Sequence, residues 1–229
     1  MKLGIMQPYF MPYIGYWQLM KAVDTYVIFD YVNYIKRGWV NRNNILVGGQ
    51  KHLFSISLKD ASQNKHFNEI MIADDFQKFL KTIRFNYQKA PYFDSVMQLL
   101  EQIVSCSDKT LSVFLMNSFQ EVLNYLEIQT KLILSSSVDK DNSLKGSDKI
   151  LDICKRLGAT TYYNAIGGQE LYDKDKFQVE GIELYFVETP IVEYPQLGKE
   201  FIPYLSLIDV LMNNSIEDVN RILDNYRLI

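Results

Sequence analysis

The segment from Gln7 to Tyr16, Q-P-Y-F-M-P-Y-I-G-Y, constrains the fold of this chain more than any other. It follows a short apolar run, Leu3 to Met6, and precedes a helix-like stretch, Trp17 to Val23. Two prolines, four aromatic residues and one glycine therefore lie at a predicted strand-to-helix junction. This composition suits a rigid wall around a small ligand, and a helix starting near Gly15 would direct free N–H groups at it. The alternative is an aromatic turn buried in the core.

Apolar runs predict an α/β protein with a Rossmann-like parallel sheet. Residues Tyr26 to Phe29 form a second buried strand, closed by Asp30. The result is a compact βαβ unit, so ligands are expected at the carboxyl ends of the strands, where Gln7 and Asp30 both lie. Further strands are predicted at His52 to Ser57, Lys131 to Leu134, Thr161 to Asn164 and Ile182 to Val187.

Helical spacing of apolar residues dominates the middle and the end of the chain. Helices are predicted to begin near Asp74 or Asp75, Pro91, Asp108, Ser147, Pro203 and Ile216. Ser215 and Asp218 resemble a capping box for the last of these. We expect one domain, 1–229, with an α/β core of about 1–60 and 131–190, a helical insertion of about 74–128, and C-terminal helices of about 200–229.

Composition excludes several classes of protein. The 229 residues are 48% hydrophobic and 22% charged, with a net charge of −3, which is ordinary for a globular domain and lacks the basic surface of a nucleic-acid binder. Cys106 and Cys154 lie among apolar residues at helical spacing, so both are predicted to be reduced packing residues. No transmembrane run and no cationic leader are evident, and we expect a soluble, cytoplasmic protein.

A second candidate for binding is the segment from Asp30 to Asn43, D-Y-V-N-Y-I-K-R-G-W-V-N-R-N, in which polar residues alternate with large aromatic ones. Asp30 would accept a hydrogen bond from a hydroxyl or an ammonium group. Arg37 and Arg42 would bind a phosphate or carboxylate, and Trp39 would stack on a base or sugar. The alternative is a solvated surface loop anchored by a buried tryptophan.

Three later segments carry weaker signals. The loop from Lys59 to Lys65 is polar, the segment from Asn164 to Tyr172 has a Gly-Gly pair that permits positive φ, and Tyr194 to Gln196 could fold over the site. Plain loops and turns are the alternatives. The two histidines lack the spacing of a zinc site, and no G-x-S-x-G elbow is present, so we predict no metal and no histidine-dependent hydrolase.

These segments resemble the WbqC-like proteins of bacterial polysaccharide gene clusters, over essentially the whole chain. The matching residues are Gly4-Ile5-x-Gln7-Pro8-Tyr9-Phe10-x-Pro12-Tyr13-Ile14-Gly15-Tyr16, Asp24, Asp30, Tyr34-Ile35-Lys36-Arg37-Gly38-Trp39-x-Asn41-Arg42-Asn43, Gly167-Gly168, Pro195-Gln196 and Phe201-Ile202-x-x-Leu205-Ser206-x-Ile208-Asp209. The family pattern has Asp-Asp-Val-Gln after the second strand, where this chain has Asp30-Tyr31-Val32-Asn33.

The resemblance implies an enzyme of O-antigen or related surface-glycan assembly, and transfer of glycine to an amino sugar is among the activities it suggests. A more distant similarity is to nucleotidylyltransferase-like α/β enzymes, which carry an H-x-G-H motif for the triphosphate of ATP at the place of P-Y-I-G-Y. Tyr13 and Tyr16 occupy the two histidine-like places here, and tyrosine has no positive charge near neutral pH. Phosphate binding would then shift to Lys36, Arg37 and Arg42.

The leading hypothesis is a transferase that joins a small acyl group, such as glycyl, to the amino group of a nucleotide-activated sugar. Asp30 is predicted to position or deprotonate the amine, with Gln7 and Tyr13 as orienting donors. The predicted substrate-binding residues are Pro8, Tyr9, Gly15, Tyr16, Asn33, Lys36, Arg37, Trp39, Asn41, Arg42, Lys65, Gly167, Gly168, Gln169, Tyr172 and Gln196. The alternatives are a nucleotidylyltransferase-like enzyme using ATP or CTP, and a non-catalytic protein that binds a sugar nucleotide. The cofactor, ATP or a nucleotide sugar, and the oligomeric state stay open.

Overall fold

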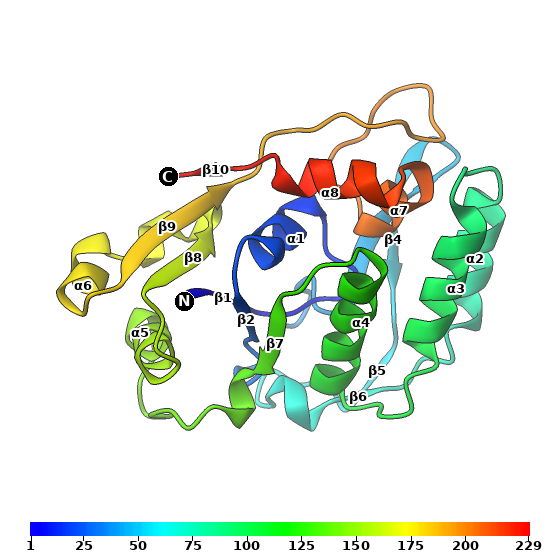
Figure 1. Cartoon of the computed structure of the whole chain (residues 1–229). Helices are drawn as coiled ribbons and strands as arrows, with labels where there is room; N and C mark the ends of the chain where they lie inside the picture. Colours follow the sequence, from blue (N-terminus) through cyan, green and yellow to red (C-terminus); the bar gives the residue numbers. More distant parts are fainter.

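A six-stranded sheet forms the centre of the computed structural model, which describes all residues, 1–229 (Figure 1). The strand order is β10-β9-β8-β1-β2-β7, and every neighbouring pair is parallel except β10 with β9. The strands are β1 (Lys2–Met6), β2 (Thr25–Ile28), β7 (Lys131–Leu134), β8 (Thr161–Ala165), β9 (Glu183–Glu188) and β10 (Arg227–Leu228). The predicted α/β class with a mostly parallel sheet is confirmed.

The order of the strands creates a switch point at the centre of this sheet. From β1 the chain builds β2 and then β7 on one side, and it returns to build β8 and then β9 on the other. Ligands of such sheets bind in the crevice between the two strands from which the chain departs in opposite directions. Here those strands are β1 and β8, whose last residues are Met6 and Ala165.

Each face of the sheet is covered by its own hydrophobic core. The helices α1 (Ile14–Lys21) and α4 (Leu111–Tyr125) pack on the face that carries Tyr26 and Ile28, and α8 (Ile216–Asp224) packs on α1. The helices α5 (Gly146–Arg156) and α6 (Lys174–Val179) pack on the face that carries Leu3, Ile5 and Val27. This follows from strand geometry, because successive side chains of a strand point to opposite faces and both faces of a parallel sheet are buried.

The long connection from β2 to β7 builds a second layer beside the sheet. It contains the hairpin of β3 (Arg42–Val47) and β4 (Gln50–Ser55), the short pair β5 (Leu58–Lys59) and β6 (Met71–Ile72), and the helices η1 (Phe67–Glu69), α2 (Gln77–Tyr87), α3 (Phe93–Val104) and α4. The remaining elements are η2 (Ser135–Ser137), η3 (Ile166–Leu171) and α7 (Leu207–Asn213).

The structure corrects three predictions of local structure. The helix expected to begin near Pro203 begins only at Leu207, with Ser206 as its N-cap. The strand expected at 52–57 is β4, which pairs antiparallel with β3 and does not join the central sheet. Helix α5 begins at Gly146 with Lys145 as its N-cap, so Ser147 lies inside the first turn and does not cap it. The cap predicted at Ser215 is confirmed, because its side chain accepts a hydrogen bond from the backbone N–H of Asp218. Both cysteines are free, as predicted.

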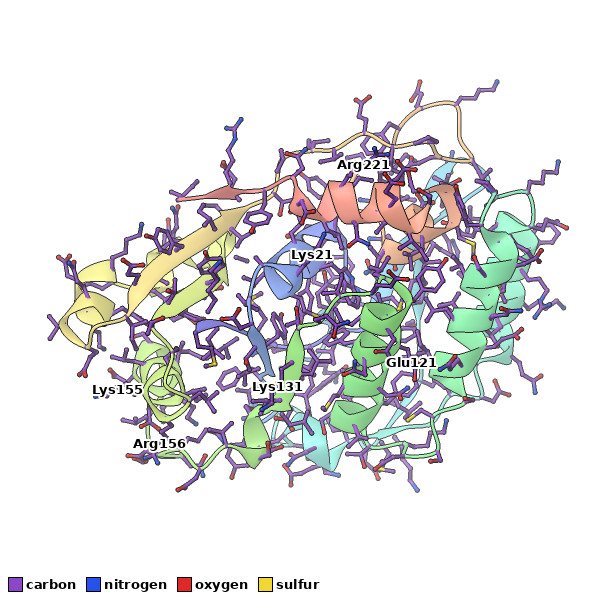
Figure 2. The ribbon with its side chains drawn as sticks, viewed as in Figure 1. Lys21, Glu121, Lys131, Lys155, Arg156 and Arg221 are labelled. Atoms are coloured by element: carbon purple, nitrogen blue, oxygen red, sulfur yellow. The ribbon has the colours of Figure 1, made fainter.

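Ion pairs connect helices at the periphery of the molecule. Figure 2 labels Lys155 on α5 and Lys21 on α1. Lys155 contacts Glu180, at the end of α6, across 2.6 Å, and Lys21 contacts Asp224 on α8 across 2.8 Å. These side chains are partly or largely exposed, so each pair contributes little to stability. None of the helices combines the length and apolarity needed to cross a lipid bilayer.

Candidate functional site

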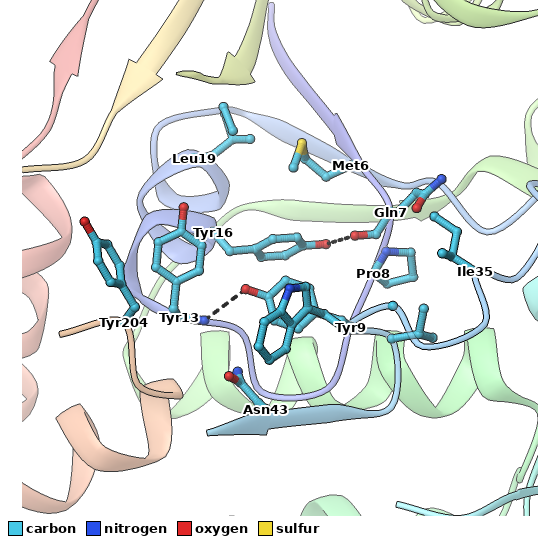
Figure 3. Close-up of a pocket in the computed structure, with 14 residues that line it drawn as sticks. Met6, Gln7, Pro8, Tyr9, Tyr13, Tyr16, Leu19, Ile35, Asn43 and Tyr204 are labelled. Carbon is cyan, nitrogen blue, oxygen red and sulfur yellow. Dashed lines mark hydrogen bonds between the residues drawn. The ribbon is translucent and has the colours of Figure 1, made fainter. Parts of the chain in front are cut away.

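A pocket with a volume of about 490 Å³ opens at the switch point of the sheet (Figure 3). It lies at the carboxyl ends of β1 and β8. Its other sides are closed by residues 7–16, called the aromatic turn below, by residues 35–43 and by Tyr204. The lining consists of Met6, Gln7, Pro8, Tyr9, Tyr13, Tyr16, Leu19, Ile35, Gly38, Trp39, Val40, Asn43, Ala165 and Tyr204.

The aromatic turn is held in place by hydrogen bonds to distant parts of the chain. The N–H of Phe10 donates to the carbonyl of Val40 across 2.9 Å. The carbonyl of Met11 accepts from Asn43 Nδ2 (2.6 Å) and from Ser206 Oγ (2.7 Å). Met11 has a φ of +47°, which is uncommon for a residue with a side chain. Because its polar groups are bonded, the turn can be buried without regular secondary structure.

Two of the three tyrosines of this turn that line the pocket bond to the backbone around them through their hydroxyls. The hydroxyl of Tyr9 accepts from the N–H of Tyr13, and the hydroxyl of Tyr16 donates to the carbonyl of Gln7, each across 3.2 Å (Figure 3). Burial raises the pKa of Tyr9, Tyr13 and Tyr16 above the ordinary value. All three are therefore neutral phenols at physiological pH, and they carry no charge into the pocket.

The N-terminus of α1 does not open into the pocket as the sequence suggested. A methyl group built on Gly15 would lie 2.5 Å from Thr189 Oγ1 and 2.6 Å from the hydroxyl oxygen of Tyr13. The side chain of Tyr13 therefore folds back over Gly15, which is buried and does not line the pocket. Glycine is needed here for a close side-chain approach, and the predicted contact of a ligand with its N–H is not supported.

The loop after β2 supplies the rim of the pocket. Trp39 lines it with 53% of its surface exposed, and the Cζ of Arg42 lies 5.8 Å from the Trp39 ring. Nε of Arg42 also donates to the carbonyl of Gly38 across 2.8 Å. Lys36 and Arg37 are exposed on the same loop, and Arg37 has a φ of +64°. Two exposed cationic residues thus belong to the loop that forms the rim, and Arg42 is held in position by its bond to Gly38.

No residue that lines the pocket is an acid, a base or a thiol. The lining offers neutral polar groups instead, namely the exposed amide of Gln7 and the hydroxyls of Tyr13 and Tyr204, none of which makes a hydrogen bond within the chain. The amide of Asn43 is already bonded to Met11 and to the N–H of Asn44. A ligand would therefore meet aromatic surfaces and a few neutral donors and acceptors.

Asp30 lies outside the pocket lining and is fully buried. Its carboxylate accepts from Ser135 Oγ (2.9 Å), from the N–H of Ser136 (2.8 Å) and from Ser136 Oγ (2.7 Å), which ties the end of β2 to the end of β7. Nearby, Lys140 is buried with its pKa lowered by burial, and its Nζ lies 4.7 Å from the ring of Tyr31. Tyr31, the departure from the family pattern, therefore covers a buried lysine.

Several other predicted residues have structural partners away from the pocket. The amide of Asn41 donates to the carbonyl of Ile56, and Gln196 forms two hydrogen bonds with the backbone of Ile202. Asn33 forms an isolated bridge with His66, next to the bond from Tyr34 N–H to the carbonyl of Lys65. As ligand contacts, Asn33, Asn41, Lys65 and Gln196 stay predictions without support from the pocket lining.

The Gly-Gly segment after β8 forms η3. Neither Gly167 nor Gly168 has a positive φ, so the left-handed turn considered at this pair is absent. Gly168 packs against the side chain of Asn164, and Gln169 is exposed. Tyr172 packs with Tyr162 and Phe177 in the core of the α5 and α6 face. Only Ala165, immediately before η3, reaches the pocket.

The lining also contains residues that were not predicted. Met6, Leu19, Ile35, Gly38, Val40, Asn43, Ala165 and Tyr204 belong to this group. Most are neighbours of predicted residues, whereas Tyr204 arrives on a segment that lacks helix or strand between Thr189 and Ser206. One indication for Tyr204 was present in the sequence: it lies within the run beginning at Phe201 that matches the pattern of the WbqC-like proteins.

Comparison with known proteins agrees with this description. A model of the WbqC-like protein family matches residues 7–221. The chain belongs to the WbqC-like protein family. The matched range includes every residue of the pocket lining except Met6. The chain is also 27% identical over 221 residues to a Mycobacterium tuberculosis protein described as uncharacterized protein Rv1507c, and the alignment covers 94% of this chain and 95% of that protein. No solved structure matches this chain.

Proposed function

We propose that this protein is a transferase of surface-polysaccharide biosynthesis that attaches a small acyl group, such as glycyl, to the amino group of a nucleotide-activated sugar. In this reaction the amine nitrogen attacks the carbonyl carbon of an activated acyl donor. The new N–C bond forms as the donor's leaving group departs, and the amine loses one proton. Membership of the WbqC-like family supports the link to polysaccharide assembly.

The uncharged aromatic pocket at the switch point is the observation that carries this proposal. Small-molecule sites are concave, mainly apolar and furnished with a few polar groups that set orientation. A sugar ring has apolar C–H faces and hydroxyl edges, which suit the aromatic side chains of Tyr9, Tyr16 and Trp39 and the free polar groups of Gln7 and Tyr13. We assign Gln7 and Tyr13 to orienting the sugar, and Asp30 to supporting the loop that follows β7.

The rim fits the nucleotide part of the same ligand. A diphosphate carries negative charge, and the exposed Lys36 and Arg37 belong to the same loop as Ile35, Gly38 and Trp39, which line the pocket. A triphosphate inside the pocket would meet no cation, because the lining contains no lysine, arginine or histidine. This favours a nucleotide sugar over adenylation with ATP or CTP.

A second candidate function is non-catalytic binding of a nucleotide sugar. It is favoured by one observation: no lining residue other than tyrosine can exchange a proton, so the pocket holds no evident general base. Under the transferase proposal, catalysis rests on holding the amine and the acyl donor together, which alone can supply a large rate enhancement. Turnover separates the two candidates.

Calorimetric titration of the purified protein tests the ligand class. UDP-N-acetylglucosamine is expected to bind about tenfold or more tightly than UDP, because its sugar ring adds contacts inside the pocket. Trp39→Ala is expected to remove this advantage, and Phe85→Ala, which alters an exposed aromatic residue outside the pocket lining, serves as the matched control. Equal affinities for the sugar nucleotide and UDP, or tighter binding of magnesium-ATP, would contradict the proposal.

The reaction class is tested on the glycan itself. Surface polysaccharide from cells with and without the gene is hydrolysed and compared by mass spectrometry. Loss of one small acyl group from an amino sugar in the deletion strain, restored by the wild-type gene, supports the transferase. An unchanged glycan together with tight binding of the sugar nucleotide supports the non-catalytic candidate.

A further inference from the structure

Tyr13 and Tyr204 form a wall between two cavities. One side of this pair lines the main pocket, and the other side lines a smaller cavity of about 30 Å³. The two ring centroids are 6.3 Å apart with an angle of 66° between the planes, and Figure 3 shows the rings side by side at one edge of the pocket. A rotation of either ring would therefore connect the two spaces.

The side chain of Tyr204 makes no hydrogen bond, whereas the backbone on either side of it is held. Tyr204 has a φ of +60°, in a region that bulky residues rarely occupy, and the residue is 58% exposed. Downstream, the N–H of Ser206 donates to the carbonyl of Asn44 across 2.8 Å. Upstream, the backbone of Ile202 bonds to Gln196. The hydroxyl of Tyr204 has no partner in the chain, so the ring can rotate without a hydrogen bond being broken.

The small cavity is mainly apolar and has no charged residue in its lining. It is lined by Ile14, Pro190, Ile191, Val192, Phe201, Pro203 and Leu205, together with Tyr13, Tyr194, Tyr204 and the single aliphatic hydroxyl of Thr189. No carboxylate lines it, so a cationic group placed there would lack a counter-ion and lose its hydration. Its volume suits a group of a few non-hydrogen atoms.

We propose that this cavity is the subsite for the acyl group on the amino sugar, and that the Tyr13–Tyr204 wall sets the size of that group. The inference rests on the proposed function and narrows it: the cavity selects a small uncharged acyl group such as acetyl, which takes the place of the glycyl group named there as an example. Tyr204 is then a specificity-determining residue. Its ring swings aside to admit the acyl group and limits the chain length by closing against it.

The test is a chain-length series of ligands. UDP-glucosamine carrying N-acetyl, N-propionyl, N-butyryl or N-glycyl groups is titrated into wild-type protein, Tyr204→Gly and Phe85→Ala. Glycine suits the positive φ at residue 204, so Tyr204→Gly removes the wall without adding backbone strain. Val192 also lines the cavity, so Val192→Ile adds one methyl group to its lining and provides a second, independent variant.

Wild-type protein and Phe85→Ala are expected to lose about tenfold or more in affinity for each methylene added beyond acetyl, and to bind the glycyl compound more weakly than the acetyl one. Tyr204→Gly is expected to flatten the dependence on chain length, and Val192→Ile to weaken binding of the acetyl compound itself. The same dependence on chain length in Tyr204→Gly and in wild type overturns this inference and leaves the proposed function standing. Failure of every compound to bind any of the proteins contradicts the proposed function, and the inference falls with it.

Discussion

The hydroxyl of Tyr16 donates a hydrogen bond to the carbonyl oxygen of Gln7 across 3.2 Å. This bond ties the first turn of α1 to the residue that follows β1, and both residues line the pocket. The ring of Tyr16 also meets the ring of Tyr9 edge-on, with centroids 5.2 Å apart. The backbone position of Gln7, from which its free amide projects, therefore depends on one phenol hydroxyl.

Tyr16→Phe is expected to lower the free energy of unfolding by about 0.5–1.5 kcal/mol, because the ring packing stays while the carbonyl of Gln7 loses its donor. Binding of UDP-N-acetylglucosamine should weaken as Gln7 becomes less ordered. Urea denaturation and calorimetry measure the two effects. The matched control is Tyr185→Phe, since the hydroxyl of Tyr185 makes no hydrogen bond within the chain and lies outside the pocket lining, so its removal should leave stability nearly unchanged. An equal loss in both variants would contradict the role given to this bond.

Gly15→Ala is expected to weaken ligand binding strongly and to destabilise the protein by about 1–3 kcal/mol. The added methyl group would meet Thr189 and Tyr13 at contact distances of 2.5 and 2.6 Å, so the Tyr13 side chain must leave its place in the pocket wall. Gly167→Ala is the control, because nothing lies within 4 Å of a methyl group there and its φ is not positive. Thermal unfolding and ligand titration should show a lower melting temperature and a weaker affinity for Gly15→Ala than for Gly167→Ala. Equal values for the two variants would show that the Tyr13 side chain can move aside without loss.

The aromatic half of the pocket could be predicted because its residues are close together in the sequence. Gln7, Pro8, Tyr9, Tyr13 and Tyr16 all lie in one strand-to-helix junction, and a junction at the carboxyl end of a buried strand must face the crevice. No long-range information was needed. The same holds for Trp39, whose loop follows the neighbouring strand.

Tyr204 and Asp30 show where such prediction fails. Tyr204 reaches the pocket because Ser206 bonds to Met11 across 2.7 Å, a contact between residues far apart in the chain that no local pattern reveals. For Asp30, the edge of the sheet was predicted correctly, but the direction of its carboxylate was not. The hydroxyls of Ser135 and Ser136, which follow β7, donate hydrogen bonds to this carboxylate. The position of these serines depends on how β7 pairs with β2.

Asp30→Ala is expected to destabilise the protein by about 1–3 kcal/mol for each buried donor left without an acceptor, with the hydroxyl of Ser135 and the N–H of Ser136 most affected. Ser136→Ala removes one of these bonds, from an exposed residue, and should cost less. If Asp30 serves only to stabilise the folded state, Asp30→Ala binds the ligand normally at low temperature, where the variant is folded. Wild-type stability combined with complete loss of turnover would instead support Asp30 as the residue that positions or deprotonates the amine.

Asp209 provides a prediction about pH. Its buried carboxylate accepts from the hydroxyls of Tyr87 (2.7 Å) and Tyr194 (2.9 Å), which anchors the segment leading to Tyr204 onto α7. Burial raises the pKa of Asp209, although both hydrogen bonds act to lower it. The folded state therefore holds this proton more tightly than the unfolded state does. The stability that Asp209 contributes is full below the ordinary carboxyl pKa of about 3.9 and falls as the pH rises through its raised value.

Asp209→Asn cannot titrate, so the unfolding free energy of wild type minus that of the variant is expected to decrease as the pH rises from about 3.5, and to level off above the raised pKa. If the folded-state pKa is raised by one unit, the difference in unfolding free energy decreases by about 1.4 kcal/mol in total. Urea unfolding followed by circular dichroism at a series of pH values measures this difference, in which the titration of all other carboxyls cancels. A flat or rising difference for Asp209→Asn would show that the two tyrosine hydroxyls outweigh burial in setting the proton affinity of Asp209.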